Sequence, residues 1–164
     1  MKTISFIILG ILFIIISGFQ PGERKLRKVQ KEREMLELLE SGKFRFVARS
    51  ARSSLGNFNN LSTHYDLDFD SLNIKAFLPY YGRAYSVPYN GEGGVKFDLK
   101  ADKIEKRWDK KKKRYIVATE VSDQHDSYSI YMTASLSGYA DVLINFRNRQ
   151  MISYYGILER LNDE

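Results

Sequence analysis

From Lys43 to the end of the chain, apolar and polar residues alternate with a period of two, which is the side-chain period of a β-strand. Nine runs show this alternation, and each is bounded by Gly, Asn, Asp, Ser or a lysine-rich turn. The runs lie at residues 43–48, 65–69, 72–76, 95–99, 104–108, 115–121, 128–134, 140–144 and 152–158. Because no helical stretch separates them, the pattern predicts a mainly β fold. We expect an antiparallel β-sandwich or a barrel-like meander of about eight or nine strands in largely sequential order.

A charged helix is predicted ahead of the strands. Glu23 to Glu40 contains no Gly or Pro, is rich in Glu, Lys, Arg and Leu, and is followed by the stop signal Ser41-Gly42. Its first half is charged on every side, whereas Met35 to Leu39 supplies an apolar stripe. We therefore expect the first turns to project into solvent as a stalk and the last turns to dock on the β domain.

The first twenty residues predict export. Residues 3–22 carry no charged side chain, and residues 4–16 are nearly continuous Ile, Leu and Phe behind the single positive charge of Lys2. This pattern, ending in the small pair Ser17-Gly18, is typical of a secretory signal peptide. The alternative is an uncleaved N-terminal membrane anchor, although the stretch is slightly shorter than the roughly 20 apolar residues of a membrane span.

Together these patterns predict three segments. A signal peptide or N-terminal anchor occupies residues 1–18, a charged helix or stalk occupies 19–42, and one antiparallel β domain occupies 43–164. The expected location is a bacterial periplasm or cell envelope. The chain has no cysteine and only two histidines, which excludes disulfide frameworks, thiolate metal sites, cysteine nucleophiles and His-rich metal sites. We identify no catalytic residue and expect no cofactor.

The basic charge is concentrated in one predicted hairpin. Asp102 to Tyr115 carries eight basic and three acidic side chains, and its tip is the run Lys110, Lys111, Lys112, Lys113 and Arg114. Such a run suits an anionic membrane surface or an acidic polysaccharide, whereas export argues against nucleic acid as a partner. The simpler interpretation is a solvated turn. Association with a membrane surface through this hairpin and the N-terminal helix is one of our three functional hypotheses.

Three acidic residues follow the strand period. Asp66, Asp68 and Asp70 fall on one face of a predicted strand, where they could chelate a hard cation such as Ca²⁺. A polar strand face explains them more simply, so we predict no metal. A second functional hypothesis is a hydrolase of envelope polymers, which needs two carboxylates about 5–10 Å apart in a cleft, drawn from Asp66, Asp68, Asp98 or Asp141.

Residues 78–94 are too irregular for a strand, with two prolines, four tyrosines and four glycines. Tyrosine combines a flat apolar ring with a hydroxyl, and arginine binds anionic groups, so this segment suits a ligand surface. The candidate ligand-binding residues are Tyr80, Tyr81, Arg83, Tyr85 and Tyr89. The alternative is a cap over one end of the sheet, with the tyrosine rings closing the core.

The same segment resembles an exported Bacteroidetes family, domain of unknown function 4251. The resemblance is carried by residues 78–85, 88–89 and 93–97, with further support at 65–67 and 152–156, and it extends from about Glu23 to Leu158. It implies a mostly β domain behind a signal sequence, an envelope location and no particular activity. Some relatives carry a lipidation cysteine after the signal, and this chain has none. It is then soluble in the periplasm or held by an uncleaved N-terminus.

The leading functional hypothesis is therefore an exported, non-enzymatic binding or accessory domain with a Tyr/Arg-lined surface. Its partner would be an envelope ligand or protein. The hydrolase and the membrane-surface protein are the two alternatives. The leading hypothesis predicts that the tyrosines of residues 78–94 border a concave surface.

Overall fold

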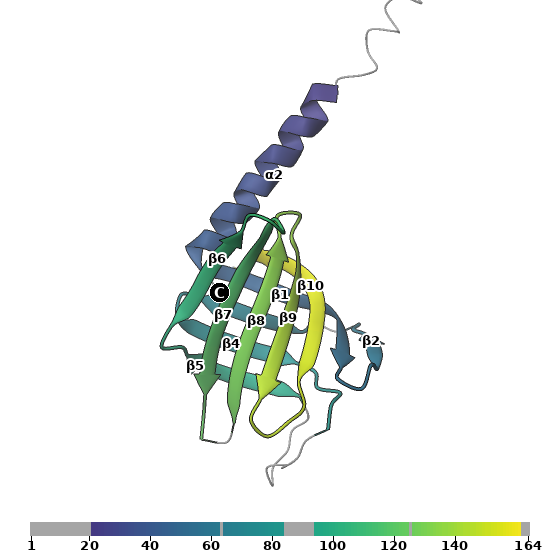
Figure 1. Cartoon of the computed structure of the whole chain (residues 1–164), viewed down its shortest axis with the longest axis vertical. Helices are drawn as coiled ribbons and strands as arrows, with labels where there is room; N and C mark the ends of the chain where they lie inside the picture. Colours follow the sequence, from purple (N-terminus) through teal and green to yellow (C-terminus); the bar gives the residue numbers. More distant parts are fainter. Residues whose placement is uncertain (1–20, 63, 84–93, 125, 162–164) are drawn as a thin grey trace, which may run out of the picture.

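The computed structural model describes residues 21–62, 64–83, 94–124 and 126–161 (Figure 1). The predicted signal peptide or anchor lies outside the described residues. The helix is α2 (Pro21–Ser41), and ten strands follow it. They are β1 (Lys43–Ser53), β2 (Phe58–Asn60), β3 (Asp66–Asp70), β4 (Asn73–Leu78), β5 (Val95–Lys100), β6 (Ile104–Asp109), β7 (Arg114–Ser122), β8 (Ser127–Ser135), β9 (Tyr139–Phe146) and β10 (Ile152–Arg160). The predicted mainly β fold with one N-terminal helix is confirmed.

The strands form one antiparallel sheet in the order β5-β4-β3-β1-β10-β9-β8-β7-β6, with β2 paired to β1. The order is that of a meander, except that β1 lies between β3 and the last strand, β10. The sheet curls on itself, so that β7 to β10 cross in front of β1 and β3 to β5 (Figure 1). The result is a curled half-barrel whose two edges are β5 and β6. Sequence analysis missed β2 because three residues are too few to show an alternation.

The inner faces of the two halves of the sheet enclose the core. The alternating apolar residues point inward, and the largest fully buried side chains include Tyr154, Phe44, Phe46, Phe69 and Met132. The phenyl rings of Phe44 and Phe69 stack with their centroids 4.8 Å apart across the β1–β3 pair. Burial of each such side chain contributes about 1.5–3 kcal/mol to stability, so this interior drives folding.

Helix α2 touches the domain only with its last turns. Leu39 is fully buried, and Met35, Leu36 and Leu38 pack partly buried against the core. Residues 23–31 are all exposed, with Leu26 71% and Val29 56% accessible. At the other end of the helix the Ser41 hydroxyl lies 2.6 Å from the Leu38 carbonyl oxygen. The first half of α2 therefore stands clear of the sheet (Figure 1). Within the described part of the chain, no helix has the length and apolar character of a membrane span.

Candidate functional site

The three aspartates predicted to share one strand face do so, on the outer face of β3. Two of them lie opposite basic residues of β1, because the register pairs Lys43 with Asp70 and Arg45 with Asp68, whereas Asp66 lies opposite Val47. The Arg45 guanidinium donates two hydrogen bonds to Asp68, with Nε–Oδ1 and Nη2–Oδ2 distances of 2.7 Å each. Lys43 Nζ lies 3.0 Å from Asp70 Oδ1.

The register extends this pairing across five strands. Glu159 of β10, Arg45 of β1, Asp68 of β3, Lys75 of β4 and Asp98 of β5 occupy one row, so the sign of the charge alternates along it. Directly opposite charges stabilise a sheet, and this accounts for Asp68 and Asp70 without a ligand. Among the described residues, no group of three or more His, Asp or Glu is arranged to hold a metal ion.

The carboxylates of the hydrolase hypothesis are distributed over this outer face. Lys75 stands between Asp68 and Asp98 in the row, and Asp68 is already engaged by Arg45. Asp141 belongs to β9 in the other half of the sheet, where it lines a small cavity of about 290 Å³ with Arg52 and other residues. The register therefore does not bring an unopposed pair of these aspartates together.

Two aspartates of β3, Asp66 and Asp68, give a prediction in which substitution changes stability in opposite directions. Burial, and then the Asp68 carboxylate, raise the pKa of Asp66 above its ordinary 3.8. An ionised Asp66 therefore costs stability at pH 7, and the cost falls as pH drops through the raised pKa. We expect Asp66→Asn to raise Tm slightly at pH 7 and to leave it unchanged below pH 3.8. Asp68→Asn should instead destabilise the fold by about 1 kcal/mol, because it weakens the two hydrogen bonds that the Arg45 guanidinium donates to this side chain. Thermal melts at pH 7 and pH 3 measure both effects, and a lower Tm for Asp66→Asn at pH 7 would contradict the assignment.

Tyr80 fastens the segment after β4 to the loop between β9 and β10. Its hydroxyl lies 2.9 Å from the Arg83 carbonyl oxygen and 2.8 Å from that of Gln150. Its ring meets Phe146 edge-on at a centroid distance of 5.4 Å and lies 5.5 Å from the Arg149 guanidinium carbon. This is the arrangement of a cap over one end of the sheet.

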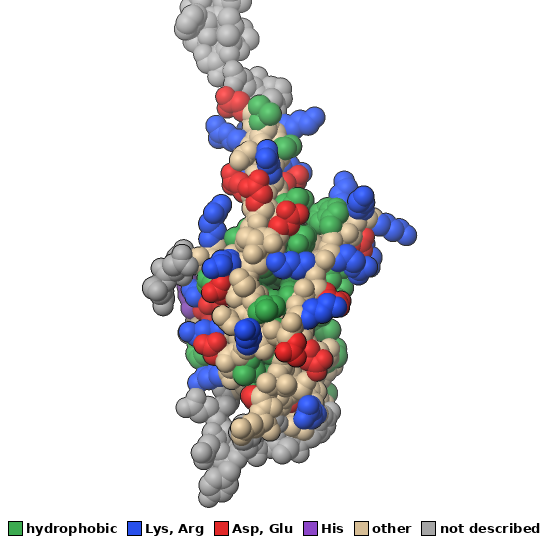
Figure 2. Space-filling model, turned by 90° about the vertical axis from the view of Figure 1, so that its left-hand side faces the viewer, with side chains coloured by type: hydrophobic (Ala, Val, Ile, Leu, Met, Phe, Trp, Pro, Cys, Tyr) green, Lys and Arg blue, Asp and Glu red, His purple; other side chains and the backbone are tan. Residues whose placement is uncertain are grey.

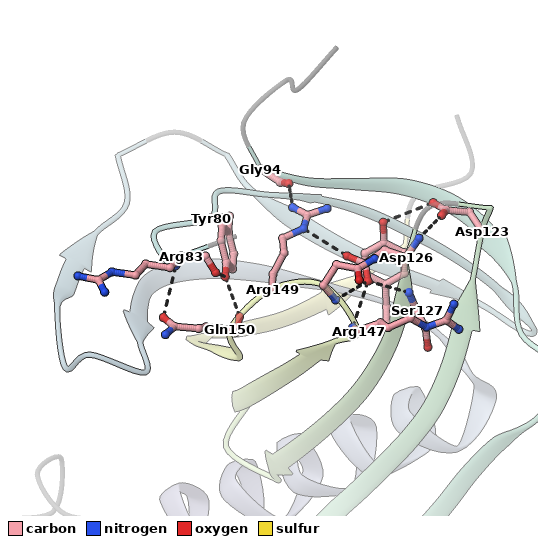
Figure 3. Close-up of polar contacts among 11 residues, drawn as sticks. Tyr80, Arg83, Gly94, Asp123, Asp126, Ser127, Arg147, Arg149 and Gln150 are labelled. Atoms are coloured by element: carbon pink, nitrogen blue, oxygen red, sulfur yellow. Dashed lines mark hydrogen bonds and ion pairs between the residues drawn. The ribbon is translucent and has the colours of Figure 1, made fainter. Parts of the chain in front are cut away.

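The other candidate ligand residues have different environments. Tyr81 is 41% accessible, and the exposed Arg83 side chain points away from Tyr80 (Figure 3). Tyr85 and Tyr89 lie outside the described residues. Tyr80, Tyr81 and Arg83 do not line the cavity at Asp141, nor the two larger grooves over β6 to β9 and along α2. The structure thus shows Tyr80 in a structural role, while the ligand surface predicted around it stays a prediction.

A buried ion pair, which sequence analysis missed, holds the same end of the sheet together (Figure 3). Asp126 is 3% accessible, and its Oδ1 accepts hydrogen bonds from the backbone N–H groups of Ser127, Arg147 and Asn148 at 2.9, 3.1 and 3.3 Å. Its Oδ2 lies 3.3 Å from Arg149 Nε. The Arg149 guanidinium also donates to the Gly94 carbonyl oxygen at 2.7 Å. We call Asp126 and Arg149 the loop clasp, because they join the β7–β8 loop, the β9–β10 loop and the entry to β5.

Two tyrosines near the loop clasp are held in their protonated form. Burial and the Asp123 carboxylate raise the pKa of Tyr128 to about 12. Burial also raises the pKa of Tyr154, whose hydroxyl donates to the Pro79 carbonyl oxygen at 2.7 Å. Neither phenol is suited to act as a base near neutral pH, so both serve as hydrogen-bond donors and packing groups.

The predicted basic hairpin is the β6–β7 turn. Lys110 to Arg114 are all exposed, and none of Lys110 to Lys113 forms an ion pair with a described carboxylate. The turn is shaped by the Asp109 carboxylate, whose Oδ1 accepts the backbone N–H groups of Lys111 and Lys112 at 3.0 Å each. These lysines therefore present their charge to solvent.

The basic hairpin and the first half of α2 lie at the same end of the molecule. Lys106 Nζ donates to the Glu40 carbonyl oxygen at 3.1 Å, and β6 and α2 slope alike from this contact (Figure 1). Four strand residues carry β6 about 13 Å to its turn at Lys110, and nine helical residues carry α2 the same distance back to Lys31. Lys and Arg side chains gather over both (Figure 2). We call this region the basic end.

A groove runs along α2 within the basic end. Its volume is about 600 Å³, and its lining comes from one stripe of α2, the β8–β9 turn and the end of β10. Four apolar side chains form its floor, namely Met35, Leu38, Leu136 and Leu158. The lining also includes five basic side chains, Arg24, Arg27, Lys28, Lys31 and Arg160, and three acidic ones, Glu32, Glu34 and Glu159. A second groove, of about 620 Å³, is polar and lies over β6 to β9.

Residues 26–158, from the first half of α2 to the end of β10, match the family described as Domain of unknown function (DUF4251). The chain belongs to the DUF4251 family. A solved structure of a DUF4251 family protein from Bacteroides eggerthii DSM 20697 is 19% identical to it, with a TM-score of 0.61. That alignment covers 82% of this chain and 90% of the other. No curated protein matches the chain.

The DUF4251 match confirms the resemblance found in residues 78–97, and the shared architecture confirms the curled β fold. The matched region includes the loop clasp, the basic hairpin and most of α2. The matched region thus contains the features that bear on the function of this DUF4251 domain.

Proposed function

We propose that this DUF4251 protein is an exported, non-enzymatic accessory domain that works at a membrane surface of the cell envelope. In this proposal residues 1–18 are a signal peptide or anchor, residues 19–42 are a stalk, and residues 43–164 are the domain that the stalk supports. The basic end faces the lipid. The observation that carries the proposal is that α2, the basic hairpin and the junction with the apolar residues 1–20 all lie at one end (Figure 1).

The two parts of the basic end, α2 and the basic hairpin, are expected to contribute unequally to attraction by an anionic membrane. The range 21–31 carries five basic side chains and one acidic side chain. Each Lys or Arg near an anionic membrane contributes about 1 kcal/mol, and this attraction falls off within a Debye length of about 8 Å at physiological salt. If α2 stands upright, the basic hairpin lies level with Lys31 and about 15 Å below Pro21. The first half of α2 then supplies most of the attraction, and the basic hairpin contributes mainly at low salt.

The two other functions receive less support from the geometry. The Tyr80 hydroxyl, which a ligand surface would use, lies against the Arg83 and Gln150 carbonyl oxygens and helps to close the sheet. For a hydrolase, the pair Asp68 and Asp98 has Lys75 between its members. The basic end, by contrast, offers exposed cations that no described carboxylate pairs with, as at Lys110.

Binding of residues 19–164 to vesicles tests the proposal. Replacing Lys25, Lys28 and Lys31 with glutamine should weaken binding to phosphatidylglycerol-containing vesicles roughly tenfold at 0.15 M salt. Lys25, about 6 Å from Pro21 along the helix, contributes close to 1 kcal/mol, whereas Lys28 and Lys31, about 10 and 15 Å away, contribute less. The matched control makes the same change at Lys110, Lys111 and Lys112. This control should have a much smaller effect at 0.15 M salt and a larger one at 0.01 M, where the Debye length is about 30 Å.

The measurement is co-sedimentation with vesicles, after circular dichroism has established that each variant is folded. Equal binding to phosphatidylglycerol and pure phosphatidylcholine vesicles would overturn the proposal. So would a result in which the two triple variants behave alike at both salt concentrations.

A further inference from the structure

We propose that the groove along α2 binds one anionic phospholipid, with an acyl chain on the apolar floor and the phosphate among the basic side chains at the outer end. This inference rests on the proposed function and specifies the partner of the basic end. Three observations carry it, namely the division of the lining by polarity, the length of the groove, and the position of the apolar residues 1–20 beyond Pro21.

Along α2 the lining separates apolar from basic groups, whereas the fifth basic side chain, Arg160, lies at the end of β10 near Leu158. Met35 and Leu38 lie at the domain end of the groove, where Leu136 and Leu158 face them from the β8–β9 turn and β10. Arg24, Arg27, Lys28 and Lys31 occupy the outer end of the same stripe. An apolar ligand would make no contact with the charge of these cations, and a free anion would leave the floor exposed to water. An anionic amphiphile satisfies both halves.

The acidic residues of the lining do not cancel this charge. Lys28 pairs with Glu32 at 3.9 Å, and Arg27 pairs with Glu23 at 3.4 Å, on the exposed helix surface. Such exposed pairs contribute little and can exchange partners. Arg24, at the outer end, forms no ion pair with a described carboxylate, so it remains available to a phosphate. The acidic Glu34 and Glu159 lie nearer the floor, where they would disfavour a headgroup that entered in the reverse orientation.

The dimensions fit one lipid. From Arg24 to Leu38 the helix rises about 21 Å, whereas one acyl chain spans one leaflet of the hydrocarbon core, about 15 Å. The remaining length is available to the glycerol and phosphate. A volume of about 600 Å³ lies within the range of small-molecule sites. Because residues 1–20 join α2 at its outer end, the basic side chains of the groove lie closest to the expected membrane surface.

A lipid that stays monomeric tests the groove without a membrane. The exported protein, expressed with its own residues 1–20 and recovered from the cell envelope, is titrated calorimetrically with dihexanoyl-phosphatidylglycerol below its micellar concentration. We expect saturable binding to one site. Dihexanoyl-phosphatidylcholine and glycerol phosphate, which lack the charge and the chains respectively, should each bind at least tenfold more weakly.

Substitutions inside and outside the groove test whether the lipid binds there. Leu136→Asp puts a carboxylate on the floor and should weaken phosphatidylglycerol binding at least tenfold. Leu55→Asp makes the same change in the exposed turn after β1 and should not alter binding. Arg24→Gln with Arg27→Gln should remove the preference for phosphatidylglycerol over phosphatidylcholine.

The outcomes separate this inference from the proposed function. If vesicle binding depends on the α2 lysines but the monomeric lipid does not bind, the groove site is wrong and the membrane function stands. If the monomeric lipid binds but vesicle binding ignores lipid charge, the membrane function is wrong. Equal effects of Leu136→Asp and Leu55→Asp would overturn the groove site. A dimer by analytical ultracentrifugation that dissociates in Leu136→Asp would overturn it as well, because a second copy of the chain would then fill the groove.

Discussion

Replacing Asp126 with alanine is expected to lower the free energy of unfolding by about 3–5 kcal/mol. The Asp126 carboxylate is almost fully buried and accepts three backbone N–H groups together with Arg149 Nε. Alanine would remove the carboxylate that these donors share, and would leave the Arg149 guanidinium with the Gly94 carbonyl oxygen but without its counter-charge, in a site that water barely reaches. An orphaned buried charge costs more than the pair contributed, and this makes the expected loss large.

Urea denaturation monitored by circular dichroism measures the Asp126 loss. Asp126→Asn keeps the shape and one acceptor oxygen, so its loss should be smaller than that of Asp126→Ala. The matched control is Asp109→Ala, which removes a carboxylate that also accepts backbone N–H groups, but in the solvated β6–β7 turn. A loss for Asp126→Ala no greater than that for Asp109→Ala would show that the loop clasp does not stabilise the fold.

The loop clasp also shows where sequence reasoning reached its limit. Asp126 and Arg149 are 23 residues apart and both lie in loops, so no periodicity relates them. The local sequence shows only that Asp123 and Asp126 are spaced as in a turn between two strands. This spacing predicts the turn, but it does not identify Arg149 as the partner of Asp126. Contacts between loops depend on how the sheet curls, which the local pattern does not encode.

The strands, in contrast, were predictable because their sequence pattern is local. A period of two follows from the geometry of each strand alone, and so all nine long strands appeared in the sequence. Strand β1 pairs with β10, which lies about a hundred residues later in the chain, and no local sequence pattern predicts this pairing. The acidic residues of β3 are an intermediate case. Alternation placed them on one face, whereas their partners on β1 became visible only with the register.

Charge at the basic end was only partly predictable. The run Lys110 to Arg114 and the basic first half of α2 are visible as composition, and so is the apolar stripe at Met35 to Leu39. Their common location depends on the contact between Lys106 and Glu40, which lie 66 residues apart. The groove along α2 depends further on the β8–β9 turn, which supplies Leu136 to its floor.

Gly156→Ala is expected to destabilise the fold by about 2–3 kcal/mol, because the core has no room for a methyl group at this position. Gly156 lies opposite Ala48 in the β1–β10 pair, beside the bulge between Ala48 and Ser50. A Cβ there would overlap the Val47 carbonyl oxygen and approach two ring carbons of Phe46 at 2.9 Å. The carbonyl belongs to a central strand and cannot move without breaking the ladder. A longer side chain should prevent folding.

Two controls separate this steric cost from other causes. Gly56→Ala adds a methyl where nothing lies within 4 Å, but at a φ of +86°, so it reports the backbone cost alone, about 1 kcal/mol. Phe46→Leu removes the ring from beside Gly156 and leaves the Val47 carbonyl in place. If the carbonyl is the obstacle, adding Phe46→Leu to Gly156→Ala should lower stability further, as measured by urea denaturation of the double variant. Rescue by Phe46→Leu would instead identify the ring as the obstacle, and the β1–β10 backbone would then tolerate a side chain at this position.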